Sequence, residues 1–526
     1  MKSQGEGSWD NPKFSYMGSC SVPDIWTWIN SLPQSPQWET DSLSISICSP
    51  KPNQPALKFS IKKHPLLSNS VVFSLLIDLR FPIILWSSNP CELNPQTLKP
   101  YQQTTFSLFL NFITHVLHYS SNTKPSPTIV NVHITPKDPK FPEFFNLCFA
   151  SMSLCVCIYE APQDIRNICL RTFQRHLTHN KSKQTQKHFL QAIGSNLEEQ
   201  WMRSLALAIT NIGPGIALEL GPYSYATPIF GAWKLRLYCP IAAMKQVGES
   251  SGECSTDDRL LFSLRHHHLE TVLQLRYSLA FQHNWVDVFM SIDNIRCDIV
   301  PLVTDALLER RGAGEEEKHF PSRISLYVTP IDDANLLSVS VFKSSDNPTH
   351  EIGTERGIET GFDAPQSYFG VKVSATDSNS MSMKPWRFEQ SAEGSSGTMS
   401  WFLHDSMDGR EVFSSRPSKM TLIQPKVWFR DRYCNAYRPF TKQGGVVFAR
   451  DEYGEGIAWR LRKEVKGMLT NWEIKGSVYV TYWPNKYRTF FCETKFVEFQ
   501  EIVQLGLVEK SFCEPSMAKE GTGLSR

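Results

Sequence analysis

Strict alternation of apolar and polar side chains recurs in the second half of the chain. Val478, Val480 and Tyr482 alternate with Tyr479 and Thr481, and Pro484-Asn485 follows as a turn. A period of two over β-branched and aromatic residues predicts a strand, so the run from Val478 and its return to Phe499 predict a hairpin. The range 271–281 alternates in the same way, with His283-Asn284 as its turn. These patterns predict antiparallel sheet, since each strand has one apolar face to bury.

The first half of the chain has a different pattern. Alternating runs at 43–48, 57–61 and 71–79 indicate a meander, after a short helix capped by Asp24. Helical spacing is expected at 105–118, 142–150, 164–177 and 184–210, and strands at 128–134, 153–159 and 229–238. This alternation favours βαβ units attached to the meander.

With 526 residues, the chain is long enough for two domains. We expect an α+β protein, in which a mixed α/β domain precedes a mostly antiparallel β domain, either a sandwich or a partly open barrel. The expected divisions are a disordered N-terminus (1–22), the mixed domain (23–244), a linker or loop (245–258), the β-rich domain (259–505) with a long irregular insertion (344–398), and a disordered tail (506–526).

Composition limits the classes of function. The formal net charge of +2 is not that of a dedicated nucleic-acid or membrane-surface binder. The 13 cysteines never occur as CxxC and no leader pattern opens the chain, which predicts a soluble protein of the cytoplasm or nucleus. No run reaches the roughly 20 apolar residues of a membrane span. Phosphate-cradling motifs are absent, which argues against P-loop and Rossmann enzymes.

Several short motifs have ordinary explanations. Gly248–Gly252 matches GxSxG but lies between polar flanks instead of a strand and a helix. His266, His267 and His268 form a run that lacks the ligand spacing of a zinc site, so no metal or other cofactor is predicted. Cys155 and Cys157 are expected to act as small hydrophobic residues on one face of a strand.

Aromatic and basic residues are densest between 426 and 505, where 14 Lys or Arg stand against 9 Asp or Glu. Such residues can stack on and hydrogen-bond a partner, although they also commonly fill and cover a β core. The candidate binding residues are Trp428, Arg430, Arg432, Tyr433, Tyr437, Arg438, Trp483, Lys486, Tyr487 and Arg488.

The segments WVDVFMSIDNIRCD, GFDAPQSYFGVKVSA, VWFRDRYCNAYRPF and VTYWPNKYRT resemble those of a plant protein family of unassigned biochemical function. The resemblance spans most of residues 23–505 and implies no activity and no site.

Three functions follow as hypotheses. The first is a non-catalytic binding or scaffold protein that holds a partner, expected to be a protein, on an aromatic and basic surface of the β domain. The second is a hydrolase-type enzyme that joins distant residues, for example His404 or His283 with Asp405, Asp408 or Asp293. The third is peripheral binding of a lipid headgroup or nucleic acid, which would depend strongly on salt.

Overall fold

The chain forms two compact units, residues 1–212 and 213–526, in a computed structural model. The structure describes residues 22–32, 40–48, 56–67, 70–93, 102–119, 132–212, 222–247, 258–312, 318–342, 350–357, 376–383, 386–403, 446–448, 456–483 and 493–508. The predicted terminal segments, 1–22 and 506–526, therefore lie almost wholly outside the described residues.

An antiparallel sheet forms one layer of the first unit. Its strand order is β1-β2-β3-β4, and a short β5 also pairs with β3. The strands are β1 (Ser42–Cys48), β2 (Ala56–Lys63), β3 (Ser70–Asp78), β4 (Ile83–Ser87) and β5 (Cys91–Glu92). The predicted meander is confirmed, with Leu43 paired to Ile61 and Phe59 to Leu75.

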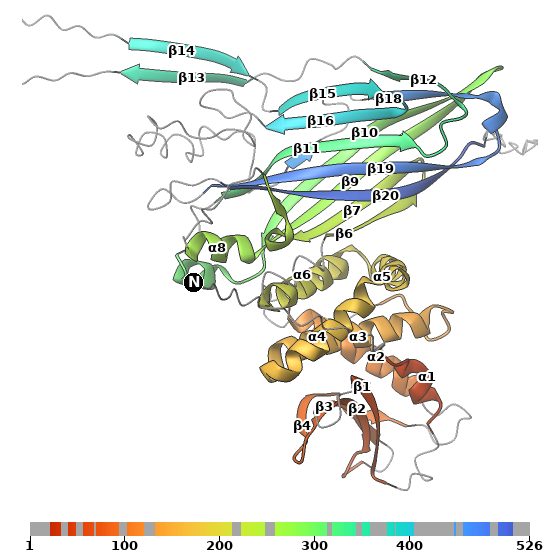
Figure 1. The fold of residues 1–526 in the computed structure, drawn as a ribbon, viewed down its shortest axis with the longest axis vertical. Coiled ribbons are helices and arrows are strands. Elements are labelled where there is room, and N and C mark those ends of the chain that lie inside the picture. The colour runs from red at the N-terminus through yellow and green to blue at the C-terminus, as the bar shows by residue number, and fades with distance from the viewer. Residues whose placement is uncertain are drawn as a thin grey trace, which may run out of the picture. The chain divides into compact units, whose positions relative to one another are not determined.

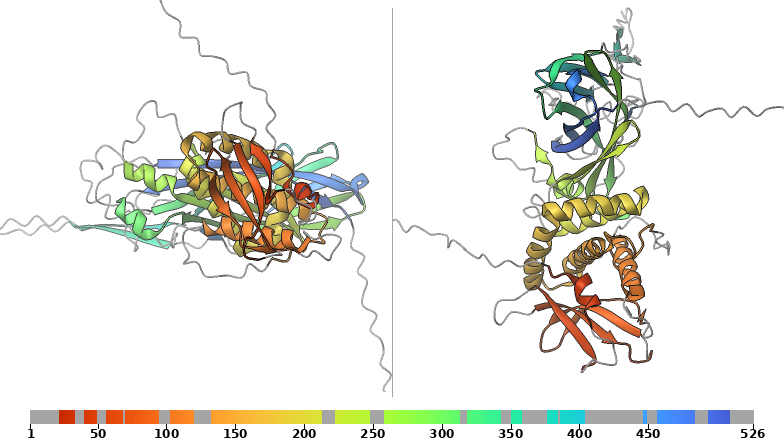
Figure 2. Two further views of the ribbon diagram at one scale, coloured as in Figure 1. Left: turned by 90° about the horizontal axis from the view of Figure 1, so that it is seen from below. Right: turned by 90° about the vertical axis from the view of Figure 1, so that its right-hand side faces the viewer.

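Helices lie on one side of this sheet (Figure 2). They are α1 (Ile25–Asn30), α2 (Gln102–His118), α3 (Phe141–Glu160), α4 (Gln163–Thr178), α5 (Asn180–Ile193) and α6 (Ser195–Ile212). Phe59 of β2 packs edge-on against Phe149 of α3, with ring centroids 4.9 Å apart, and Phe112 of α2 lies 5.6 Å from Phe149. Asp24 caps α1 as predicted, because its carboxylate accepts the Thr27 backbone N–H.

Three of the secondary-structure predictions for this unit are wrong, and one of them is the strand at 128–134, whose described residues 132–134 form no strand. The run 153–159 is the second half of α3, not a strand, so the sheet is antiparallel and the expected βαβ units do not form around it. This helix is buried on almost every side, which erases the polar stripe that would reveal its 3.6-residue period. The predicted helix 184–210 is two helices, because Gly194 has φ +84° and ends α5.

Helix α3 is also long and apolar enough to cross a membrane by length and composition, contrary to the prediction that no run reaches that length. Of its most apolar window, 83% is buried inside the structure. The core helix of a soluble protein passes the same test, and here α3 contributes Phe145, Phe149 and Cys155 to the interior of the first unit.

The second unit consists mainly of two antiparallel sheets (Figure 1). The seven-stranded sheet has the order β12-β18-β10-β9-β7-β6, and β17 also pairs with β10. Its strands are β6 (Tyr223–Ile229), β7 (Ala232–Pro240), β9 (His267–Phe281), β10 (Trp285–Pro301), β12 (Leu336–Val341), β17 (Val446–Phe448) and β18 (Ile457–Arg462).

The six-stranded sheet has the order β15-β16-β11-β19-β20-β8. Its strands are β8 (Lys245–Gln246), β11 (Lys318–Pro330), β15 (Trp386–Glu393), β16 (Ser396–Leu403), β19 (Leu469–Trp483) and β20 (Glu493–Gly506). The remaining described elements are the helices α8 (Asp258–Arg265) and α9 (Asp305–Arg310), the 3₁₀ turns η2 (Ile241–Ala243) and η4 (Lys463–Val465), and the separate hairpin of β13 (His350–Gly357) and β14 (Thr376–Met383).

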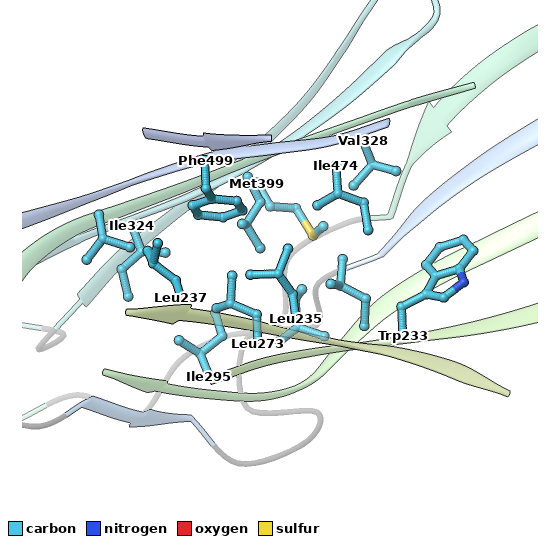
Figure 3. Close-up of a cluster of buried hydrophobic side chains, with 14 of the residues drawn as sticks. Trp233, Leu235, Leu237, Leu273, Ile295, Ile324, Val328, Met399, Ile474 and Phe499 are labelled. Atoms are coloured by element: carbon cyan, nitrogen blue, oxygen red, sulfur yellow. The ribbon is translucent and has the colours of Figure 1, made fainter. Parts of the chain in front are cut away.

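The two sheets share one apolar core (Figure 3). Leu235, Leu273 and Ile295 from the seven-stranded sheet face Ile324 and Ile474 from the six-stranded sheet. Each is at most 1% exposed, and each belongs to the apolar set of an alternating strand. The predicted α+β class, with a mixed first part and an antiparallel β second part, is confirmed, and the second part is a sandwich.

The division between the units falls at residue 212, earlier than the predicted linker 245–258. The reason is that β7 pairs with β9, for example Leu235 with Leu273, so β6 and β7 belong to the sandwich. The predicted irregular insertion 344–398 is also wrong in its described parts, which form β13, β14, β15 and the start of β16.

Gly476 provides a stability test, because the Phe499 ring covers it across the β19–β20 pair. A Cβ at this position would lie 2.3 Å from Phe499 Cζ and 2.9 Å from the Ser325 carbonyl oxygen. We expect Gly476→Ala to lower the free energy of unfolding by about 2 kcal/mol, as overpacking of a tight core does. Urea denaturation of the two proteins measures this, with the half-buried neighbour Ser477→Ala as the control that should change little.

Candidate functional site

The ten residues predicted from the sequence mostly lie outside the described residues. This applies to Trp428, Arg430, Arg432, Tyr433, Tyr437, Arg438, Lys486, Tyr487 and Arg488. Trp483 ends β19, where its backbone pairs with Lys318. Whether these residues form one surface therefore stays a prediction.

Described residues of the same types nevertheless form a row across the outer face of the six-stranded sheet. Each of the six strands contributes one residue, and each residue is the cross-strand neighbour of the next. In spatial order the members are Arg387 (β15), Phe402 (β16), Arg323 (β11), Tyr479 (β19), Phe496 (β20) and Lys245 (β8). We call this set the cation–aromatic row.

Consecutive members of the row are in contact. The Arg387 guanidinium carbon lies 4.9 Å from the Phe402 ring centroid, and that of Arg323 lies 4.8 Å from the same centroid. Arg323 is also 5.2 Å from the Tyr479 ring, so two rings flank one guanidinium. Tyr479 stacks on Phe496, with centroids 5.3 Å apart and planes 18° from parallel. Lys245 Nζ completes the row at 5.7 Å from the Phe496 ring.

The two ends of the row are its most exposed parts. The side chains of Arg387 and Lys245 are 46% and 65% exposed, and each cation contacts a carboxylate. Arg387 pairs with Glu389 at 3.2 Å, and Lys245 pairs with Glu498 at 2.7 Å. The members between them are half-buried or, for Phe402, buried. The row is therefore aromatic between its ends apart from Arg323, and two of its three cations are paired with carboxylates.

Hydroxyl groups border the row on both sides. Arg323 Nε donates to Ser325 Oγ at 3.1 Å, and Ser400 Oγ donates to the same oxygen at 3.0 Å. On the other side, Thr481 Oγ1 donates to Ser322 Oγ at 2.8 Å. The bond to Ser325 orients the Arg323 side chain, and all four hydroxyl residues are buried, so they support the row from beneath.

A β-bulge in β11 places Arg323 in the row. The register with β19 shifts by one residue between Pro321 and Arg323. Before the bulge, His319 lies opposite Tyr482, which faces the core, and after it Arg323 lies opposite Tyr479 on the outer face. Two residues of equal parity on one strand therefore point to opposite faces, because a one-residue shift reverses the pleat.

The histidine run lies at one end of the sandwich and begins just after α8. His266 Nδ1 donates to the Phe262 carbonyl oxygen at 2.8 Å, and His267 Nδ1 donates to that of Ser263 at 2.6 Å. His266 forms a turn before β9, and His267 and His268 begin that strand. Among the described residues, no group of three or more His, Cys, Asp or Glu side chains is placed to hold a metal ion.

His267 and His319 bring the two sheets together at this end. Their ring centroids are 4.1 Å apart, and the His319 ring lies 4.4 Å from Tyr482. A hydrogen bond of 2.9 Å joins His319 Nε2 to Ser263 Oγ. Burial lowers the pKa of His267 to about 4, and it lowers the pKa of His319 well below its usual value, with His267 and Lys495 adding to the effect.

The remaining sequence candidates do not form a catalytic group within the described residues. His283 Nδ1 contacts Asn284 Oδ1 in the β9–β10 turn, whereas Asp293 lies eight residues beyond the start of β10, about 25 Å along an extended strand. His404, Asp405, Asp408 and the GxSxG segment lie outside the described residues. Cys155 and Cys157 are buried on α3, where burial raises the pKa of the Cys155 thiol to about 12.

The sequence contained only part of the signal for the row. Alternation predicted that Tyr479 lies on the other face of its strand from Val478, and that Phe496 lies on the other face of its strand from Val497. This is the observed arrangement. Arg323, Arg387 and Lys245 were missed because each lies in a different strand, and no local pattern indicates that these strands join β16, β19 and β20 in one sheet. The bulge in β11 further conceals Arg323 from a count of alternate residues.

The histidine pair predicts an acid-sensitive second unit. Because both folded-state pKa values lie below the value of about 6.5 expected for the unfolded chain, the unfolded state takes up protons first. Stability is therefore fully present above about pH 6.5 and falls as the pH drops toward 4, by on the order of 2 kcal/mol.

Urea denaturation at pH 7.5 and pH 5 measures the effect. His319→Gln should reduce this pH dependence, whereas His283→Gln, which changes an exposed turn residue, should keep it. Equal pH dependence in wild type and His319→Gln would contradict the assignment.

Comparisons with known proteins add no family or activity. No family model matches the chain, and no curated protein matches it. Among solved structures, Clostridium perfringens delta-toxin is matched with a TM-score of 0.18 and 10% sequence identity, over 53% of this chain and 99% of that one. A likeness at that TM-score carries no argument about function, and the function must be argued from the chain's own residues.

Proposed function

We propose that this chain is a non-catalytic binding or scaffold protein that holds a protein partner on the cation–aromatic row of its six-stranded sheet. One observation supports the proposal: all six strands of the sheet each supply a cation or a ring at one level. Core packing does not require this arrangement, because the row lies on the face opposite to the shared core.

The chemistry of the row favours a protein over a phosphate-bearing ligand. Aromatic residues and arginine are the types enriched where proteins bind each other, since they combine large contact area with directed hydrogen bonds. Both end cations are already paired with Glu389 and Glu498, which leaves little net positive charge. Nucleic acids and anionic lipids are bound mainly through uncompensated positive charge.

We also propose that the protein is soluble and lies in the cytoplasm or nucleus. It is supported by the buried free thiols among the described residues, including Cys148, Cys239 and Cys297, a pattern typical of a reducing compartment.

The test is a comparison of partner capture by full-length variants. In Arg323→Ala/Tyr479→Ala the central guanidinium and its neighbouring ring are lost, so we expect the captured partner to fall at least tenfold, about 1.4 kcal/mol. Tagged wild type and variants are used for affinity capture from cells that express the protein, and recovered proteins are quantified by mass spectrometry.

Lys475→Ala is the matched control, because Lys475 lies on the same face of β19 but outside the row and pairs only with exposed or half-buried groups such as Glu473. It should leave capture unchanged. Equal capture by the double variant and wild type, with both proteins folded by circular dichroism, would refute the proposal. Capture that disappears in moderate salt would instead favour a phosphate-bearing ligand.

A further inference from the structure

The edges of the two sandwich sheets differ in how they are protected. Exposed edge strands invite pairing with other chains unless charge, proline or short length prevents it. Strand β15 carries Arg387, Glu389 and Glu393, β8 and β17 have two and three residues, and β6 contains Pro228. Strand β6 is also held to β20 by a hydrogen bond from Ser224 Oγ to Glu501.

Strand β12 lacks charge and proline over its six residues, and after a register shift between Leu336 and Ser338 its last four residues pair regularly with β18. Its sequence, LLSVSV, contains no charge and no proline, and within the described chain its one partner in the sheet is β18 (Figure 1). Leu337 is 49% exposed and Val341 is 36% exposed. An uncharged, β-branched edge of this kind is a template for strand addition.

The direction of the backbone groups on β12 follows from its end. The Phe342 N–H donates to the Gly456 carbonyl oxygen, on the side of β18. In an antiparallel pair successive residues point their N–H and C=O groups to opposite sides, so those of Val339 and Val341 point away from β18. Gln390 of β15 occupies the end of the β12–β18 ladder, where its amide oxygen accepts the Gly456 N–H at 3.1 Å, and this contact lies on the β18 side.

The pattern of β12 is symmetric about Val339. Ser338 and Ser340 flank it and are both exposed, on the face shared with Arg460 and Ala458 of β18. Val339 itself lies opposite Trp459 and packs against the core. A strand with this symmetry matches a second, antiparallel copy of itself: Val339 opposes Val339 of the second copy, and Ser338 opposes Ser340.

We propose that the protein forms a homodimer in which β12 of two copies pair antiparallel about Val339, making one continuous sheet. The second copy is favoured over an unrelated strand because the self-pairing aligns Val339 with Val339, serine with serine, and Leu337 with Val341, which are both apolar. This interface is separate from the cation–aromatic row, so either proposal can fail without the other.

Charge placed at the two serines tests both the interface and its register. In Ser338→Lys/Ser340→Lys, lysines would face each other twice across the interface, and opposed like charges weaken a strand pair. We expect the dimer dissociation constant to rise about tenfold or more. Ser338→Glu/Ser340→Glu should weaken self-association in the same way, while an equal mixture of the two variants should form a heterodimer.

Sedimentation velocity measures each case against the 60.0 kDa mass of one chain. Denaturation curves check that both variants fold, which is expected because the two side chains are exposed. A wild-type protein that sediments as one chain at the highest concentration reached would overturn the proposal. A dimer unaffected by either variant, or variants that weaken but do not pair when mixed, would overturn the pairing of β12.

Discussion

The second unit depends on burial of one alternating face from each of two sheets. Leu235, Leu273, Ile324 and Ile474 are fully buried where the sheets meet, and area removed from water is the main favourable term for such a core. Because alternate side chains of a strand point to its other face, the residues between these apolar positions do not pack in the core and need not be apolar. The cation–aromatic row occupies that second face on the six-stranded sheet.

The row and the histidine pair illustrate two uses of aromatic and basic residues in one sandwich. In the row, cations contact rings at 4.8–5.7 Å, and such contacts contribute about 0.5–1 kcal/mol each at exposed positions. At the histidine pair the rings are close but the proton is excluded, since a charged imidazole would lie against its neighbour between the sheets. The first arrangement tolerates positive charge, and the second selects against it.

Sequence reasoning succeeded where one strand or helix carries its own signal. The alternation at 271–281, 478–483 and 493–499, the Asp24 cap and the helix at 105–118 all correspond to observed elements. It failed at 153–159, where burial on all sides of α3 removes periodicity, and at the domain division, which depends on β7 pairing with β9. For the candidate surface, only the residue types were predicted and not the residues themselves. Cross-strand neighbours such as Arg323 and Phe402 are 79 residues apart, and no local pattern in the sequence connects them.

The bulge between Pro321 and Arg323 makes chain length at that point a constraint in its own right. Losing one residue there would restore an uninterrupted pleat, and the first residues of β11, from Lys318 to Pro321, would then turn over relative to the rest of the strand. The buried His319 ring would then move to the surface, and His267 on β9 would lose its ring contact. Point substitutions are therefore far more tolerable at this position than deletions, and diverging descendants of this gene should keep the spacing even where they change the residues.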